Sequence, residues 1–131
     1  MFLLDSNTCI QFLNGRSASI QRRLMGTKPS EIKLCSVVKA EMWYGAARSN
    51  NVSAAMSRLI AFFTPYESLP FDDVAAVEYG RIRGQLAQAG LPIGANDLMI
   101  AAIALGRELT LVTHNTREFS RVSGLSTEDW E

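Results

Sequence analysis

The chain has 131 residues, of which 47% are hydrophobic and 20% charged, a composition that fits one folded domain with its own core and excludes a disordered chain. Its 13 basic and 13 acidic residues give a formal net charge of zero, which argues against a protein that coats nucleic acid through a strongly basic surface. The sequence has no apolar run long enough to span a bilayer and no secretory leader, so we expect a cytoplasmic protein.

The opening residues predict a strand that stops at a carboxylate. The apolar run 2–4 indicates a buried strand, Asp5 follows it directly, and the polar residues 6–8 then introduce a helix. Ligands of open parallel α/β sheets bind at the carboxyl ends of the strands, so we expect Asp5 to face a cation or a polar reactant. The alternative is that Asp5 only caps the helix that it precedes.

The next segment repeats this order. Asn14-Gly15 ends the first helix, residues 17–25 predict a second short helix, and the alternating residues 32–35 predict the second strand. Ser36 is the expected cap of a helix over 37–48. Val38, Met42 and Ala46 share one face of that helix, whereas Glu41 lies on another, either in a site or on a solvated surface.

Three more helical or extended segments follow in the middle of the chain. An amphipathic helix over 52–63 carries Ala55, Met56, Leu59, Ile60 and Phe63. Residues 66–71 predict a weak strand, which Pro70 assigns to a sheet edge. A long helix capped by Asp72 or Asp73 runs to Ala89. Its inward side chains are expected to be Val74, Val77, Ile82 and Leu86.

The last third of the chain contains the most apolar helix. Residues 95–105 predict a buried central helix, with Asp97 in its first turn either as a ligand or at the positive end of the helix dipole. Residues 109–112 predict the fourth strand, followed by a helical turn over 117–121 and a tail over 124–130. Strands that alternate with helices predict an α/β fold over 1–131, with a mostly parallel central β-sheet flanked by α-helices.

Three carboxylates and the end of the fourth strand are expected to meet at one sheet edge. Asp5, Glu41 and Asp97 would gather there with Asn115 and Glu118, because the first and fourth strands are plausible neighbours. Gathered carboxylates repel one another unless a cation lies between them, and an all-oxygen cluster suits Mg²⁺ or Mn²⁺. Such an ion activates water and stabilises the charge of phosphodiester cleavage without a side-chain nucleophile.

Other catalytic chemistry has little support in this chain. His114 is the single histidine, so a His-rich zinc site is excluded, and no G-x-S-x-G motif accompanies it. Cys9 and Cys35 lie in apolar contexts without a C-x-x-C spacing, which favours two buried free thiols over a disulfide.

Four motifs, together covering essentially the whole chain, resemble the PIN-domain ribonucleases and specifically the VapC toxins of bacterial toxin–antitoxin systems. The motifs are Leu4-Asp5-Ser6-Asn7, Glu41 within 38–45, Asp97 within 94–102, and residues 112–119 with the tail 124–130. The resemblance implies a PIN domain over 1–131 that acts as a metal-dependent endoribonuclease. In it Asp5, Glu41 and Asp97 hold Mg²⁺, with Mn²⁺ as a possible substitute, and Glu118 joins them as a catalytic residue.

Two positions depart from the family pattern. Ser6 replaces the usual Thr and keeps the hydroxyl, whereas Asn115 stands where many members carry a fourth Asp. An amide supplies no charge, so either Asn115 or Glu118 completes the site, and one or two metal ions remain possible. Asn96 is only a secondary candidate, because neighbours on a helix point about 100° apart. Supporting roles around Asp5 or the scissile phosphate are expected for Ser6, Asn7, Thr113 and Asn115.

The resemblance also implies the partners. These are an RNA substrate, with tRNA foremost, a VapB-type antitoxin that blocks the site, and a homodimer or a toxin–antitoxin hetero-oligomer that meets operator DNA only through the antitoxin. No membrane is implied. Lys39, Arg117 and Arg121 are the expected RNA-backbone contacts, and the alternative for each is a solvated surface charge.

Two other functions have less support in the sequence. A phosphotransferase of the haloacid-dehalogenase type would carry Asp-x-Asp after the first strand, and this chain has Asp5-Ser-Asn7. A degenerate PIN domain acting as a non-catalytic RNA- or protein-binding module would lack a core acid. All three core acids are present, and only Asn115 leaves room for that alternative.

Overall fold

The computed structural model describes all 131 residues and contains one five-stranded parallel sheet in the order β3-β2-β1-β4-β5. The α/β fold with a parallel central sheet is confirmed. The strands are β1 (Phe2–Leu4), β2 (Ile32–Cys35), β3 (Glu67–Leu69), β4 (Thr110–Val112) and β5 (Thr127–Glu128).

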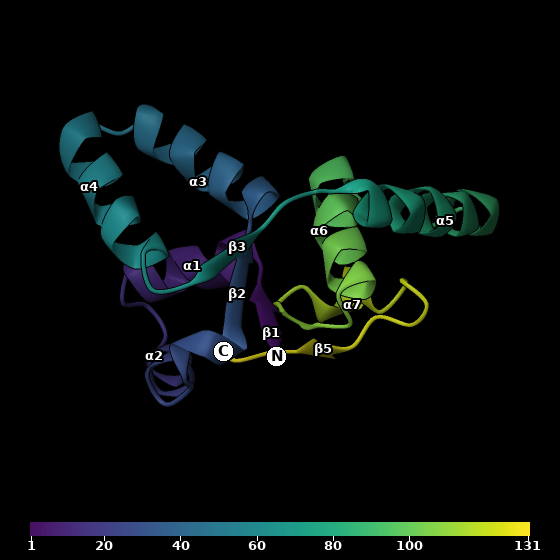
Figure 1. Ribbon diagram of the computed structural model, residues 1–131, viewed down its shortest axis with the longest axis horizontal. Helices are drawn as coiled ribbons and strands as arrows, with labels where there is room; N and C mark the ends of the chain where they lie inside the picture. The colour runs from purple at the N-terminus through teal and green to yellow at the C-terminus, as the bar shows by residue number, and fades with distance from the viewer.

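Seven α-helices and one short 3₁₀ segment, Pro29–Glu31, connect and flank the strands. The helices are α1 (Ser6–Leu13), α2 (Ala18–Met25), α3 (Ser36–Ala47), α4 (Val52–Phe63), α5 (Asp73–Ala89), α6 (Ala95–Gly106) and α7 (Thr116–Phe119). Figure 1 shows two helix pairs on opposite sides of the sheet: α3 packs on α4 at one side, and α5 packs on α6 at the other. No helix of the structure is both long and apolar enough to cross a bilayer.

The central strands and α6 form the middle of the core. Leu3, Leu4 and Leu111 are completely buried, and the run Ile100–Ala104 of α6 is buried throughout. Parallel strands covered on both faces are expected to be apolar at successive positions, as β1 and β4 are. The predicted burial of α6 is therefore confirmed.

The predicted pairing of the first and fourth strands is also confirmed. β1 and β4 are parallel neighbours, with Leu4 opposite Val112. The backbone N–H of Asp5 donates to the carbonyl of Val112 at 3.1 Å, so the two strands end at the same edge of the sheet. Asp5 and Thr113, the residues that follow these strands, thus lie side by side.

Several local predictions were wrong. The tail contains β5, whose two residues are too few to show a sequence period. Cys35 rather than Ser36 is the N-cap residue of α3, and it makes no side-chain capping bond. On α5, Val74 and Val77 are 55% and 72% exposed, because the side of α5 that is buried carries Ala75, Ile82 and Leu86.

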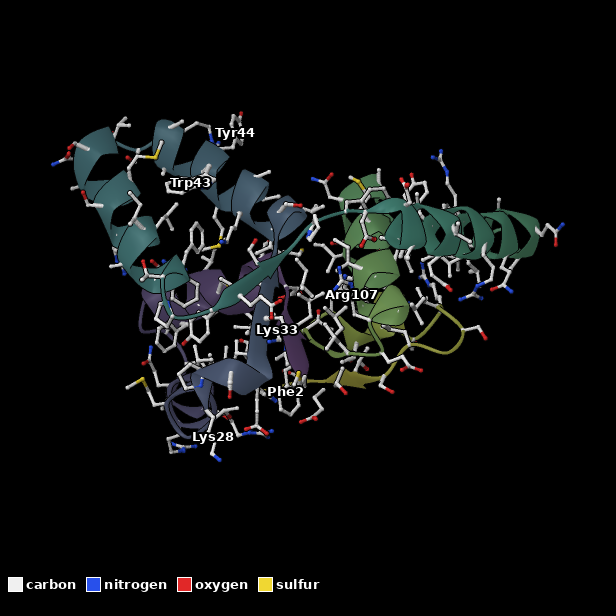
Figure 2. The ribbon with its side chains drawn as sticks, viewed as in Figure 1. Phe2, Lys28, Lys33, Trp43, Tyr44 and Arg107 are labelled. Atoms are coloured by element: carbon white, nitrogen blue, oxygen red, sulfur yellow. The ribbon has the colours of Figure 1, made fainter.

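The outer helix pair shows a similar correction on α4. Ile60 is exposed, whereas Phe62 is buried in its place. On α3, Trp43 points toward α4, where its ring packs edge-on against Phe63 at 5.3 Å, and Tyr44 points outward (Figure 2). One face of this pair is therefore built from aromatic side chains of both helices.

Candidate active site

A cavity of about 310 Å³ opens at the edge of the sheet where β1 ends, and we call it the acidic cavity. Its walls come from α1, α3, α6 and the segment after β4. The residues that line it are Asp5, Ser6, Asn7, Glu41, Asp97, Asn115 and Phe119. The structure thus brings together the three core acids that the sequence placed on three separate elements.

Asp5 is buried at the start of α1 and has two tasks. Its Oδ1 accepts a hydrogen bond from the backbone N–H of Thr8 at 2.9 Å, which makes Asp5 the N-cap of α1. The same helical turn is tied to β4, because the Thr8 hydroxyl donates to the carbonyl of Val112 at 3.3 Å. The cap uses one carboxylate oxygen, and Asp5 also lines the acidic cavity, so capping is not its only possible task. Its contact with a cation stays a prediction.

Glu41 is half-buried on α3 and is bonded across to α1. The Ser6 hydroxyl donates to its Oε1 at 2.7 Å. A carboxylate on a solvated helix face would have no such partner. Glu41 is therefore oriented by a residue that directly follows Asp5 in the chain.

Asp97 lies in the first turn of α6, half-buried. Burial raises the pKa of Asp97 to about 6, and repulsion from the carboxylates of Glu118, Glu41 and Asp5 adds to this effect. Gly94, which has no side chain, is the N-cap of α6, so Asp97 does not cap this helix. Carboxylates that are partly buried and close to one another make this position a candidate for a cation site.

The segment after β4 supplies the fourth wall. The buried Thr113 hydroxyl accepts from the backbone N–H of Asn115 at 3.0 Å, and the Asn115 side chain donates to the Glu118 carboxylate. Asn115 lines the acidic cavity, whereas Glu118 does not line it but is close enough for its charge to raise the pKa of Asp97. The amide and the carboxylate thus act as a linked pair.

None of the three candidate RNA-binding residues lines the acidic cavity. The Lys39 ammonium lies over the Phe63 ring, 4.8 Å from its centroid, on the side of α3 that meets α4. Arg121 donates to the carbonyl of Pro92 at 3.4 Å, and Arg117 is exposed on α7. Their contact with RNA stays a prediction.

Asn96 lines a neighbouring cavity of about 490 Å³ rather than the acidic cavity. That second cavity lies between α3 and α6 and shares only Glu41 with the first. The separation agrees with the roughly 100° turn between adjacent helical residues.

A cluster formed by His114, Asp129 and Glu131 was not predicted from the sequence. Its ligand-type atoms all lie within 4.8 Å of one another, a spacing that the oxygens of the three core acids do not reach. The hydrogen bond to Asp129, together with the charges of Glu131 and Asp129, raises the pKa of His114. The cluster depends on the pairing of β5 with β4, which the sequence pattern did not reveal.

The two cysteines are free and buried, as expected. Burial raises the pKa of the Cys9 thiol and raises the pKa of Cys35 to about 11. Neither thiol is available as a thiolate nucleophile near neutral pH.

The comparisons with known proteins agree with this geometry. The family model described as "PIN domain" matches residues 2–125. A "tRNA(fMet)-specific endonuclease VapC" of Shigella flexneri is 40% identical over 98% of this chain and 97% of that protein. A "Ribonuclease VapC2" of Rickettsia felis is 36% identical over 100% of this chain and 98% of that protein.

Solved structures give the same result. The crystal structure of VapBC2 from Rickettsia felis, bound to a DNA fragment from the promoter, has a TM-score of 0.93 at 35% identity and covers 99% of this chain and 98% of that chain. DNA-bound VapBC from Salmonella typhimurium has a TM-score of 0.93 at 36% identity, with the same coverage.

Proposed function

The chain belongs to the PIN-domain family, and we propose that it is an endoribonuclease toxin of the VapC type that uses a divalent metal ion, Mg²⁺ foremost. The observation that carries this proposal is the gathering of Asp5, Glu41 and Asp97 around one cavity. Similarity along almost the full length of VapC ribonucleases supports it.

The side chains of the acidic cavity fit a hard divalent cation. Asp5, Glu41 and Asp97 would hold the ion, with the linked pair of Asn115 and Glu118 completing its surroundings. The atoms that these side chains offer a cation are all oxygens, because the Asn115 amide nitrogen donates to Glu118 and leaves its carbonyl oxygen. Oxygen is the ligand atom that Mg²⁺ and Mn²⁺ prefer. When bound, the ion would supply water activation and charge stabilisation for cleavage of a phosphodiester bond.

The chain's own residues would prepare the site for this chemistry. The backbone N–H of Thr8 holds one oxygen of Asp5, and the Ser6 hydroxyl holds one oxygen of Glu41. Both carboxylates are thereby oriented before substrate arrives, which lowers the cost of reorganisation during the reaction. The pKa of Asp97, about 6 in the metal-free protein, would fall beside a cation, so that the carboxylate stays ionised at lower pH.

The proposed substrate is RNA, and tRNA in particular. A relative 40% identical to this chain is named a tRNA(fMet)-specific endonuclease. Arg117 and Arg121 stand beside Glu118 in the sequence and are the better candidates for the RNA backbone, with Lys39 as a third. We propose the cytoplasm as the location of the protein, because its proposed substrate is RNA.

The proposed partners are a VapB-type antitoxin and a second copy of the toxin. The solved relatives at a TM-score of 0.93 are toxin–antitoxin complexes with DNA. The neutral net charge of this chain does not suit sequence-independent DNA binding, so operator DNA would be contacted through the antitoxin.

The test is cleavage of purified total tRNA by the antitoxin-free protein with Mg²⁺, Mn²⁺ or EDTA, beside the Asp5→Ala variant. Discrete fragments that disappear with EDTA and with the variant are expected. Cleavage that survives Asp5→Ala would contradict the assigned site. A folded wild-type protein that cleaves with neither ion would favour the non-catalytic binding module.

A further inference from the structure

The segment Ser126–Glu131, which we call the tail segment, runs along the edge of the sheet next to β4. The backbone N–H groups of Leu111 and Thr113 donate to the carbonyls of Ser126 and Glu128, each at 2.9 Å. Thr113 is the first residue after β4. The tail segment therefore holds the chain at the point where it leaves the sheet toward the acidic cavity.

Trp130 fixes the tail segment in place. Its side chain is almost fully buried, its ring packs edge-on against Phe2 at a centroid distance of 5.2 Å, and the Arg23 guanidinium covers it at 4.7 Å. Its Nε1 donates to Glu128 Oε1 at 3.2 Å, and Arg23 donates to the same oxygen at 3.0 Å. Phe2 lies near the meeting point of the two chain ends (Figures 1 and 2). The tail segment is thus held in place by packing and by hydrogen bonds.

His114 links the tail segment to the segment after β4 that lines the acidic cavity. Its Nδ1 lies 2.9 Å from Asp129 Oδ2 and 3.2 Å from Glu131 Oε2. The next residue, Asn115, lines the acidic cavity and donates to Glu118. The segment that carries this pair has little stability of its own, because α7 has four residues and an isolated helix of that length does not form.

We propose that the tail segment, acting through His114, positions Asn115 and Glu118 in the acidic cavity, an inference that rests on the proposed nuclease function. His114 is a positioning residue in this arrangement. Its side chain is 61% exposed and contacts the carboxylates of Asp129 and Glu131, and it does not line the cavity. Breaking that contact frees the segment after β4 while the three core acids keep their places on α1, α3 and α6.

Two variants isolate the contact: His114→Ala, and the double variant Asp129→Ala with Glu131→Ala. We expect kcat on a tRNA substrate to fall about tenfold with KM within about twofold, and Mn²⁺ to bind several-fold more weakly in a thermal-shift titration without RNA. His114→Asn should retain most of the wild-type kcat and Mn²⁺ affinity, because the amide nitrogen of Asn can donate from about the position of Nδ1. Combining the two variants should add little, since both break one contact.

The matched control is Glu67→Gln, which weakens the 2.7 Å ion pair between the exposed Glu67 on β3 and Lys33 on β2. It should leave kcat and Mn²⁺ affinity unchanged. The proposal would be overturned if both test variants kept the kcat and the Mn²⁺ affinity of the wild type. It would also be overturned if the control lost as much of either as the test variants. If the wild type binds Mn²⁺ but cuts no RNA, the proposed function fails and the Mn²⁺ affinities alone decide the positioning role. A wild type that binds no Mn²⁺ overturns both.

Discussion

Ser6 and Glu41 are joined by a hydrogen bond of 2.7 Å that crosses from the first turn of α1 to α3. The two residues are far apart in the sequence, and the bond orients a core acid from the residue that follows another core acid. Replacing one hydroxyl should therefore disturb a carboxylate on a different helix.

Ser6→Ala should lower kcat about tenfold, because Glu41 loses the donor that orients it. Ser6→Thr keeps a hydroxyl and should retain most of the activity. Steady-state cleavage of a tRNA substrate measures both. Ser57→Ala, on the exposed surface of α4, is the matched control. Equal rates for Ser6→Ala and this control would show that the hydrogen bond has no role in cleavage.

Asp97 should destabilise the metal-free protein above pH 6. The pKa of Asp97 is about 6 in the folded protein, above the ordinary value of 3.8. Between these two pH values the folded protein holds a proton that the unfolded chain has released. The free energy of unfolding therefore falls as pH rises from about 4 to about 6. Asp97→Asn removes this penalty. Allowing for solvent screening of a half-exposed group, the variant should be more stable by about 1 kcal/mol near neutral pH, with little difference at about pH 4. Urea unfolding in EDTA measures this, and a variant less stable than wild type at neutral pH would contradict it.

Divalent metal should reverse that penalty. Mn²⁺ at about 100 times its dissociation constant should add about 2.7 kcal/mol to the free energy of unfolding, because it binds the folded state alone. The gain should shrink as pH falls below 6, where Asp97 takes up its proton. EDTA should abolish the gain, as should Asp97→Asn. Thermal unfolding at several pH values is the measurement, and equal stabilisation of wild type and Asp97→Asn would place the metal elsewhere.

Two substitutions on α5 test which side of that helix is buried. Ile82→Ala should cost about 3 kcal/mol, because Ile82 is 1% exposed in the core. Val77→Ala should change stability by less than about 0.5 kcal/mol, because Val77 is 72% exposed. Urea unfolding of the metal-free chain measures both. A large loss for Val77→Ala would mean that this side of α5 is covered in solution.

The α5 example shows where sequence patterns reach their limit. The period of a helix indicates that one side is buried, but Val74 and Ala75 are adjacent, and only packing against α6 decides between them. The ends of β1 and β2 and the span of α4 followed from apolar runs, polar caps and breakers, and the structure has the predicted bounds.

The candidate site was predictable to a similar degree. Asp5, Glu41 and Asp97 each stood out because a carboxylate interrupted an apolar context or followed a strand. The bonds from Ser6 to Glu41 and from Asn115 to Glu118 could not be read from spacing, because they depend on rotamers and on the distance between helices. The contact of His114 with Asp129 required β5, a strand defined by its partner rather than by its residues.

The order of the strands has a consequence for how the chain folds. β1 lies early in the sequence at the centre of the sheet, and one of its two neighbours, β4, comes near the other end. Contacts between such distant segments give a high contact order, which slows folding. Asp5 can meet Asp97 and Asn115 only after almost the whole chain has collapsed around β1. A partial chain that lacks α6 or the segment after β4 therefore lacks part of the acidic cavity.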